Sequence, residues 1–146
     1  MSTTRGSDEA AIHQWVDQLL EAVQTKNVDV LRTLYTEDIV SFDVQPPLQH
    51  LGVDAKLKNW NDAFTMFGTI GYDVRDVNVT VGEELAVGRG FFKLSGTLAD
   101  DTAVPGMWVR WTGCFRRQGD GWAVFHDQVS VPFDPAQGNA AVDLTP

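Results

Sequence analysis

The chain has 146 residues, of which 43% are hydrophobic and 21% are charged, proportions typical of a single globular domain. Its formal net charge of −9 argues against nucleic acid or an anionic membrane as partner, because phosphate binding needs clustered Lys and Arg. Cys114 is the single cysteine, which excludes an intrachain disulfide. The polar start lacks the apolar core of a signal peptide, and no stretch approaches the roughly 20 apolar residues of a membrane helix, so we expect a cytoplasmic protein.

Apolar side chains at helical spacing predict a long and then a short helix at the start of the chain. We expect residues 1–6 to form a disordered tail and Ser7 to cap the first helix. The apolar positions follow the i, i+3, i+4, i+7 pattern: Ile12, Trp15, Val16, Leu19, Leu20 and Val23. Lys26-Asn27 ends this helix, and the spacing of residues 30–35 predicts a second, shorter one.

The next segment is typical of a strand, and it carries a carboxylate. Residues 39–44 alternate between two faces. One face holds Val40, Phe42 and Val44, and the other holds Ile39, Ser41 and Asp43. The dipeptide Pro46-Pro47 ends the strand. Residues 53–66 then form a third predicted helix, whose apolar stripe is Leu57, Trp60, Phe64 and Phe67.

After Gly68 the pattern changes to long alternating runs that predict strands. The runs span about residues 72–81, 84–98, 104–117 and 122–131. Short connections between them force antiparallel neighbours, and the glycines inside them are expected where a sheet bends sharply. Three helices followed by a meander make one α+β domain over residues 7–134, with the helices on one face of a curved sheet. We expect residues 135–146 to be an extended tail.

Several short stretches, taken in their order, carry a resemblance to a known fold. They are the helix of Trp15, Leu34-Tyr35-Thr36-Glu37-Asp38, Phe42-Asp43, Gly52, Trp60, Val109-Arg110-Trp111-Thr112, Gly119-Asp120-Gly121-Trp122 and His126-Asp127-Gln128-Val129-Ser130-Val131-Pro132. Their order and spacing resemble the nuclear-transport-factor-2-like cone, the fold of ketosteroid isomerase and of SnoaL-like polyketide cyclases. The resemblance covers about residues 8–134. It implies a curved sheet and helices that enclose a conical, mostly apolar pocket.

Asp43 is the residue on which the predicted chemistry depends. By the resemblance it matches the general-base aspartate of ketosteroid isomerase, which removes a proton next to a carbonyl while acidic donors hold the enolate charge. The alternative is that Ile39, Ser41 and Asp43 form the wet face of an edge strand. The donor side departs from the isomerase, because Trp15 stands where that enzyme has its catalytic tyrosine and Gly113 where it has its protonated aspartate. Trp15 and Gln128 are therefore the expected hydrogen-bond donors, and the sequence does not identify an oxyanion donor.

The final predicted strand supplies further candidates. The resemblance implies that His126, Gln128 and Ser130 face the cavity, where His126 would act as an acid or base near neutral pH. The alternative is a histidine that hydrogen-bonds a buried neighbour and fixes the strand. His50, which follows the proline turn, is placed either at the pocket rim or in solvent.

The predicted cavity has aromatic walls and needs no cofactor. Its walls are Trp15, Tyr35, Trp60, Trp111 and Phe115. The three histidines of the chain lack the short repeated spacing of a metal site. The sequence contains no phosphate loop, nucleophile elbow or dinucleotide fingerprint, so we expect neither a metal nor a nucleotide cofactor.

These residues predict a small-molecule pocket protein acting on an apolar carbonyl compound by acid–base chemistry, as an isomerase, cyclase or dehydratase with Asp43 as the base. The alternative is a non-catalytic binder of a small hydrophobic molecule, or a dimeric association module. Relatives of this fold commonly dimerise through the outer sheet face. The resemblance thus implies a homodimer with Trp108 in its interface, unless the tail partly covers Trp108.

Overall fold

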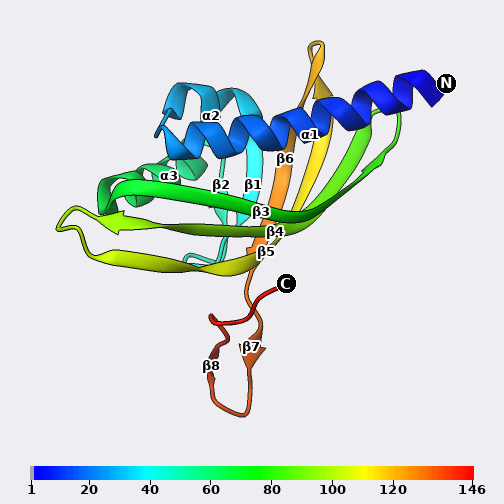
Figure 1. Cartoon of the computed structure of the whole chain (residues 1–146). Helices are drawn as coiled ribbons and strands as arrows, with labels where there is room; N and C mark the ends of the chain where they lie inside the picture. Colours follow the sequence, from blue (N-terminus) through cyan, green and yellow to red (C-terminus); the bar gives the residue numbers. More distant parts are fainter. Residues whose placement is uncertain (1) are drawn as a thin grey trace.

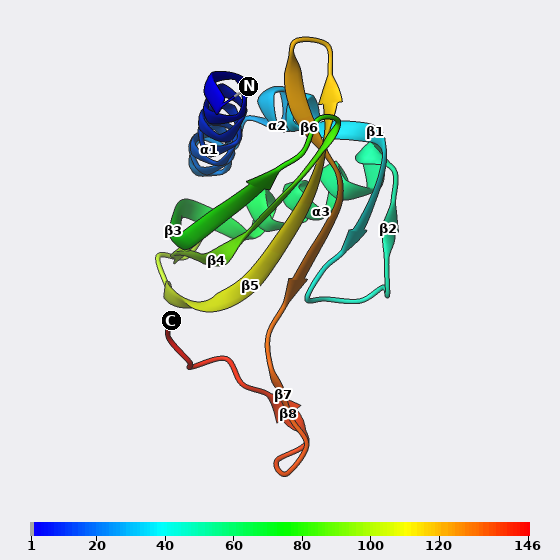
Figure 2. The same cartoon turned by 90° about the vertical axis from the view of Figure 1, so that its right-hand side faces the viewer.

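The computed structural model describes the backbone of residues 2–146 and the side chains of residues 5–146. Within it, helices cover one face of a strongly curved six-stranded sheet (Figures 1 and 2). The helices are α1 (Ser2–Gln24), α2 (Val28–Leu34) and α3 (Val53–Met66). The strands of this sheet are β1 (Tyr35–Phe42), β2 (His50–Leu51), β3 (Phe67–Val81), β4 (Leu85–Leu98), β5 (Ala103–Gln118) and β6 (Gly121–Ser130). The predicted α+β cone with three helices is confirmed.

Helix α1 starts earlier than the sequence pattern suggests. Residues 2–6, predicted as a disordered tail, are helical, so Ser7 lies inside the helix and is not its N-cap; Met1 lies outside the described residues. A tertiary contact holds this end, because Arg117 Nη2 of β5 lies 2.7 Å from Asp8 Oδ2. Such an ion pair between distant segments is invisible to a local sequence pattern. Figure 1 shows α1 running across the sheet, and Figure 2 shows it end-on.

The strand order is β2-β1-β6-β5-β4-β3. The long meander β3–β6 is antiparallel throughout, as its short connections predict. Strand β1 instead runs parallel to β6, pairing Ser41 with Asp127. It follows α2 directly, because Tyr35 is already extended (φ −119°, ψ 149°). This pairing places the strand of Asp43 beside the last long strand.

Two glycines make room for a tryptophan on the inner face of the sheet. A Cβ built on Gly113 would lie 2.4 Å from Cζ2 of Trp111, and one built on Gly88 would lie 3.0 Å from its Cη2. The ring of Trp111 thus occupies the space that side chains at these two positions would need. Strands β4 and β5 pair Gly88 with Gly113, so the two residues form one recess.

A β-bulge in β6 reverses which of its side chains face the helices. The β5–β6 register pairs Phe115 with Val124 and Cys114 with His126, which leaves Phe125 without a partner. One extra residue shifts the alternation of a strand by one position. The buried or half-buried inward side chains are Trp122 and Val124 before the bulge, then Asp127 and Val129 after it.

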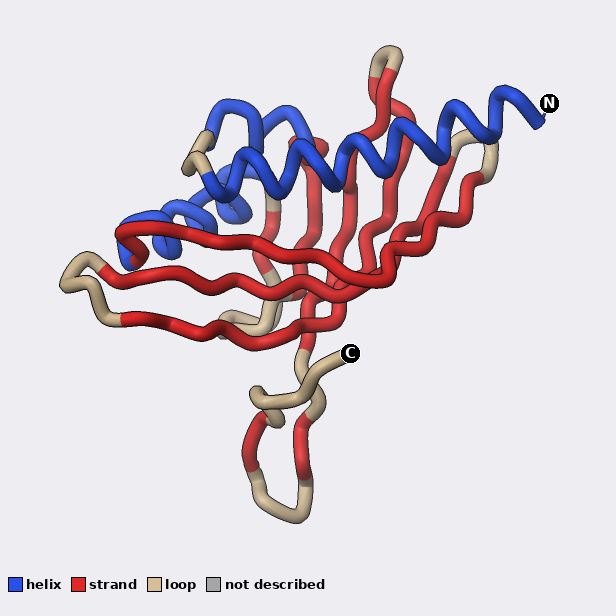
Figure 3. Tube along the Cα trace, in the orientation of Figure 1, coloured by secondary structure: helices blue, strands red, loops and turns tan. Residues whose placement is uncertain are grey.

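The last residues form a small hairpin where the sequence predicts an extended tail over residues 135–146. Strands β7 (Phe133–Asp134) and β8 (Asn139–Ala140) pair with each other in a separate two-stranded sheet. Figures 1 and 3 show this hairpin projecting away from the helices and the main sheet. Within residues 2–146, no helix combines the length and apolar character that crossing a bilayer demands.

The recess under Trp111 yields a stability prediction. In Gly113→Ala the new Cβ would overlap the Trp111 ring, so we expect a loss of about 1–3 kcal/mol in the free energy of unfolding, as for other overpacked cores. The matched control is Gly121→Ala, where the nearest atom to a new Cβ lies 4.0 Å away. Urea denaturation of both variants is the measurement. Equal stability of the two variants would contradict this account of the recess.

Candidate active site

Helix α3 carries a lysine whose side chain is buried between the helix and the sheet, near two carboxylates. The Lys56 side chain of α3 is 4% exposed, and its Nζ lies 3.0 Å from Asp127 Oδ2 and 3.8 Å from Asp43 Oδ2. It also donates to Ser41 Oγ at 3.0 Å, and the Ser41 hydroxyl in turn donates to Asp127 Oδ1. A buried charge is tolerated only when it is paired and hydrogen-bonded, and each member of this cluster is.

The charges of the cluster support one another. Burial by itself lowers the pKa of Lys56, but Asp127, Tyr35 and Asp43 outweigh that effect and hold the pKa above its usual value. The lysine therefore stays an ammonium ion. With two carboxylates around one ammonium, the cluster keeps a net charge of −1 when all three groups are ionised.

Asp43 is the member of the cluster that reaches solvent. Its side chain is 20% exposed, against 4% for Asp127. Its Oδ2 accepts a hydrogen bond from Asn59 Nδ2 at 2.6 Å, and its Oδ1 accepts one from the Val44 N–H at 2.7 Å. These contacts fix the orientation of the side chain. Asp43 is thus a positioned carboxyl group that solvent can reach.

Strand β1, which ends one residue before Asp43, does not expose the face of Ile39 and Ser41 to solvent. Ile39 and Ser41 of the same face are both 0% exposed, which contradicts the alternative that these residues face water. Their face lies under α3, whose Lys56 contacts Ser41. The predicted inward direction of Asp43 is therefore confirmed, while its chemical role stays a prediction.

Two tyrosine hydroxyls lie near the carboxylates. Tyr35 is 3% exposed, and its hydroxyl accepts a hydrogen bond from Trp60 Nε1 at 3.1 Å. Burial raises the pKa of Tyr35 to about 12, with the Asp127 and Asp43 carboxylates adding to the rise and Lys56 opposing it. Burial, Tyr35 and the same carboxylates raise the pKa of Tyr72 well above its usual value. Both hydroxyls therefore remain proton donors at neutral pH.

An aromatic wall surrounds these polar groups. The rings of Tyr72 and Phe92 stack at 5.1 Å, and Tyr72 meets Trp60 edge-to-face at 5.8 Å. The predicted wall residues are brought together: Trp15 stacks on Trp111 at 6.0 Å and meets Phe115 at 5.0 Å. Trp60 and Tyr72 are half-buried, whereas Trp15, Trp111 and Phe115 are buried, so Trp60 and Tyr72 form the more exposed part of the wall.

Trp15 does not supply the expected donor. Its indole Nε1 already donates to the Leu34 carbonyl at 2.9 Å, and the side chain is 4% exposed. An indole has a single N–H, so Trp15 has no donor left for a ligand while this bond lasts. Its observed role is to pack in the wall and to tie α1 to the end of α2.

His126, Gln128 and Ser130 lie on the outer face of the sheet, so their predicted direction is wrong. The bulge at Phe125 moves Asp127 inward in their place. His126 Nδ1 bonds the Val40 carbonyl at 2.7 Å, which corresponds to the alternative of a histidine that fixes the strand. Gln128 is exposed, and the Ser130 hydroxyl accepts from Arg110 Nε at 3.1 Å.

His50 stands in an unusual position. Strand β2 pairs it with Ser41, so it shares the inner side of the sheet edge near Asp43. Its Nε2 atom is buried and has no hydrogen-bond partner among the described residues. A buried polar nitrogen without a partner is costly unless a ligand or water satisfies it. This is consistent with the predicted rim position and not with a solvated loop.

The sequence contains signals for two of the unpredicted site residues. Lys56 falls within the apolar spacing of α3 between Val53 and Trp60, a position where a charge must be buried. Asn59 lies three positions further on, which brings both side chains to the side of Asp43. Asp127 could not be found by alternation, because the bulge at Phe125 has no distinct local signature.

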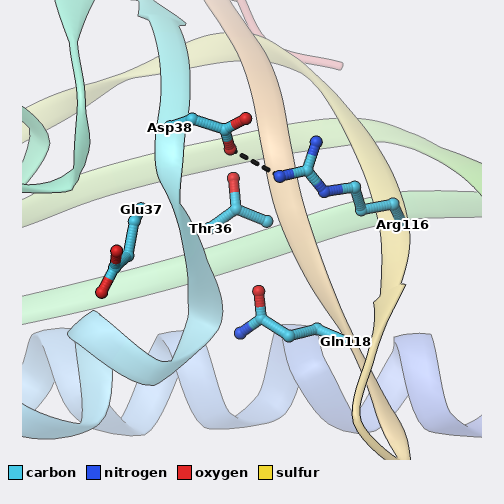
Figure 4. A pocket seen from close by; sticks show the side chains of 5 residues that line it. All are labelled: Thr36, Glu37, Asp38, Arg116 and Gln118. Carbon is cyan, nitrogen blue, oxygen red and sulfur yellow. Dashed lines mark hydrogen bonds and ion pairs between the residues drawn. The ribbon is translucent and has the colours of Figure 1, made fainter.

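A hollow lies on the opposite face of the sheet and is less suited to chemistry. It has a volume of about 470 Å³ and is lined by Thr36, Glu37, Asp38, Arg116 and Gln118 (Figure 4). Its main charges are already paired, since Arg116 Nη2 lies 2.6 Å from Asp38 Oδ1. Figure 4 shows these side chains on β1 and β5, with the Arg116 guanidinium pointing toward Asp38. None of them contacts the Lys56 cluster.

Solved structures share this architecture over nearly the whole chain. An NTF2-like protein of unknown function from Pseudomonas putida KT2440 matches with a TM-score of 0.84 at 26% identity, covering 97% of this chain and 98% of that one. A candidate scytalone dehydratase from Novosphingobium aromaticivorans DSM 12444 matches with a TM-score of 0.82 at 13% identity, covering all of both chains. A candidate dehydratase of the NTF2-like family from Streptomyces avermitilis matches with a TM-score of 0.75 at 18% identity, covering 86% of this chain and 97% of that one.

Sequence comparison gives the family directly. A search of curated proteins finds no match to the chain. The profile of the SnoaL-like domain matches residues 12–134, which include every element from α1 to β7 at least in part. The chain therefore belongs to the SnoaL-like domain family.

Proposed function

We propose that this protein is an enzyme that acts without a cofactor on a small, largely apolar carbonyl compound. It would remove a proton from the carbon next to the carbonyl group and return it elsewhere or eliminate water. The observation that carries the proposal is Asp43, an accessible carboxylate fixed by Asn59 and Lys56 beside two protonated tyrosines. A base and proton donors in one apolar site are the parts that enolate chemistry requires.

The proposed step begins with the carboxylate of Asp43 taking a proton from the carbon next to the carbonyl. The electrons of that C–H bond move to the carbonyl oxygen, giving an enolate. The Tyr35 hydroxyl accepts from Trp60 and keeps its own proton, which is free to bond this oxygen. Return of the proton from Asp43 to another carbon completes an isomerisation. In a dehydration the enolate electrons form a C=C bond to the next carbon, and the hydroxyl of that carbon leaves as water with the proton that Asp43 holds.

Lys56 would position Asp43 rather than touch the substrate. Its ammonium is buried between two carboxylates and does not reach solvent. The Asp127–Ser41–Lys56 hydrogen bonds fix the ammonium, and the ammonium in turn restricts the Asp43 carboxylate. A base held rigidly in place reacts faster than one that must be oriented at each turnover.

Dehydration is the reaction that the structural neighbours favour. Two of them, from Streptomyces avermitilis and Novosphingobium aromaticivorans, are described as candidate dehydratases of this fold. Dehydration next to a carbonyl uses the same base and the same oxygen donor as isomerisation. The aromatic wall around Trp60 and Tyr72 would suit a flat, cyclic substrate.

We also propose that the protein is a homodimer that meets through the outer face of its sheet. Leu85 and Val87 of β4 are 56% and 43% exposed on that face. Trp108 of β5 lies on the same face, half-buried. Aromatic and apolar side chains of this kind are enriched at the cores of protein interfaces.

Replacement of the base tests the proposal most simply. Cyclic and aromatic ketones are incubated with the protein in D2O, and NMR follows the loss of protons next to the carbonyl. We expect catalysed exchange for at least one ketone, and a loss of about 10²–10⁴-fold in Asp43→Asn, the usual contribution of a general base. Tyr35→Phe should lose on the order of 10²–10³, the usual cost of one oxyanion donor.

Asp62→Asn is the matched control, since Asp62 is an exposed α3 carboxylate paired only with Lys58. It should exchange protons at the wild-type rate. If ketones bind but none exchanges in the wild-type protein, the alternative of a non-catalytic binder replaces the proposed enzyme.

The protonation of the tyrosines gives a spectroscopic prediction. The chain has two tyrosines, and both have a raised pKa in the folded protein. Tyrosinate absorbance at 295 nm should therefore be absent from the folded protein at pH 10, yet half-developed there in denaturant. Because the folded state holds these protons more tightly, folding stability should fall as pH rises from 10 to about 12. Half-titration of the folded protein at pH 10 would refute the burial of these hydroxyls.

The buried lysine gives a stability prediction. In Lys56→Met the Asp127 carboxylate loses its cation, so we expect a loss of about 3–5 kcal/mol in the free energy of unfolding. The double variant Lys56→Met/Asp127→Asn should recover part of this loss. Lys58→Met is the control on the same helix, because Lys58 is exposed, and it should change stability by less than about 0.5 kcal/mol. A small effect of Lys56→Met would mean that the cluster is not a buried charge network.

A further inference from the structure

The last residues of the chain form an arm that the rest of the chain does not cover. We define the arm as residues 131–146, which include the β7–β8 hairpin and project from the end of β6 (Figures 1 and 2). None of these residues is buried. The apolar side chains of Phe133, Val142 and Leu144 are 65%, 50% and 54% exposed. Among the described residues, the hydrogen bonds of residues 132–141 stay within the arm, such as the one from the Ala141 N–H to the Pro132 carbonyl.

Such an arm is poorly stabilised by its own contacts. Strands β7 and β8 have two residues each, and an isolated two-stranded hairpin is marginally stable at best in water. Apolar side chains that stay exposed on an ordered segment commonly mark an interaction site. The arm therefore needs a surface to dock on.

The outer face of the sheet carries a strip with matching properties. We define the basic strip as Arg75 of β3, Arg89 and Lys93 of β4, and Arg110 of β5, together with Trp108. Arg75 and Lys93 lie over the Trp108 ring at 4.8 Å and 5.3 Å from its centroid. Register brings the strip together, because Phe91 pairs with both Arg75 and Arg110.

The four basic side chains of the strip form no ion pair among the described residues, although Arg110 donates to Ser130 Oγ and the register places Asp73 opposite Lys93. Among residues 5–146, none of these four bases has a carboxylate within 4.0 Å. They are 4 of the 11 basic residues in a chain whose net charge is −9. A concentration of unpaired positive charge on one face of an acidic protein is suited to an acidic partner.

We propose that the arm of one copy docks on the basic strip of a second copy, with Phe133 near Trp108. The arm contains Asp134 and Asp143 and no Lys or Arg, so its charge is opposite to that of the strip. It also offers Phe133, which is 65% exposed, as an apolar anchor for the half-buried Trp108 ring. The proposal rests on the homodimer proposed above and adds the arm as a segment that links the two copies.

Two-fold symmetry makes this contact reciprocal. If the outer faces of two copies meet, each arm leaves its own sheet and reaches the partner's strip, so two identical contacts form. The inference does not depend on the catalytic role of Asp43, which lies on the opposite face of the sheet under α3. Failure of the ketone assay would therefore leave the docking of the arm intact.

Photocrosslinking of the full-length protein tests the proposal. Phe133 is replaced by p-benzoylphenylalanine, the protein is irradiated, and peptide mapping locates the crosslinked residue. We expect a product of twice the chain mass, with its crosslink between residue 133 and residues 89–93 or 108–112 of the other copy. The control places the same amino acid at Leu48, which is 96% exposed and off the arm, and it should give no such product.

The possible outcomes distinguish the proposed homodimer from the proposed docking of the arm. Sedimentation of the wild-type protein as a monomer would overturn both proposals. A dimer that gives only intrachain crosslinks, or none, would overturn the docking of the arm and leave the homodimer standing.

A charge variant adds an independent measurement. Asp143→Lys reverses an exposed arm charge, and we expect it to weaken the dimer roughly two- to fivefold, as for a single surface ion pair. The control is Asp17→Lys, which makes the same change of net charge on an exposed position of α1. Equal dimer affinity of the two variants would contradict docking on the basic strip.

Discussion

The buried ammonium of Lys56 is the constraint around which the rest of the site is arranged. It joins α3 to β1 through Ser41 and Asp43, and to β6 through Asp127. A charge at this depth is stable only with its carboxylates in place, so the parallel pairing of β1 with β6 and the position of α3 are coupled to it. The same ammonium keeps Asp43 at the one point where the cluster meets solvent. Structure and proposed chemistry thus depend on one set of contacts.

The aromatic wall explains how such a polar cluster can lie inside a small domain. Trp60 bonds the Tyr35 hydroxyl, and its ring packs against Phe64 and Tyr72. These rings exclude water from the tyrosine hydroxyls, which keeps them protonated and raises their capacity to hold a developing negative charge. Trp111 fills the deeper part of the cone above Gly88 and Gly113. Asp43, with a side chain that is 20% exposed, is therefore the part of the cluster that a ligand could reach.

Local patterns in the sequence predict most of the fold, because they are strong in this chain. The apolar stripe of α3 predicts its bounds of residues 53–66. The alternation of residues 39–44 places Asp43 on one face with Ile39 and Ser41, and the resemblance favours the inner side for that face. Two features depend on distant contacts and could not be predicted in this way. The bulge at Phe125 turns Asp127 inward and His126 outward, and the Leu34 carbonyl takes up the indole N–H of Trp15. Trp15 is therefore no longer a candidate donor to a ligand, and the proposed mechanism assigns that part to the Tyr35 hydroxyl, which the sequence places only in the aromatic wall.

A crystal structure of the protein with a bound flat phenol, which mimics an enolate, tests the central claim most directly. The account predicts the phenol in the cone beside Trp60, with its oxygen about 2.6–3.2 Å from the Tyr35 hydroxyl and a ring carbon facing the Asp43 carboxylate. His50 Nε2 should gain a partner from the ligand or from a water that the ligand fixes. Binding of the phenol on the outer face of the sheet, or a Tyr35 hydroxyl that donates to the protein instead, would contradict the account.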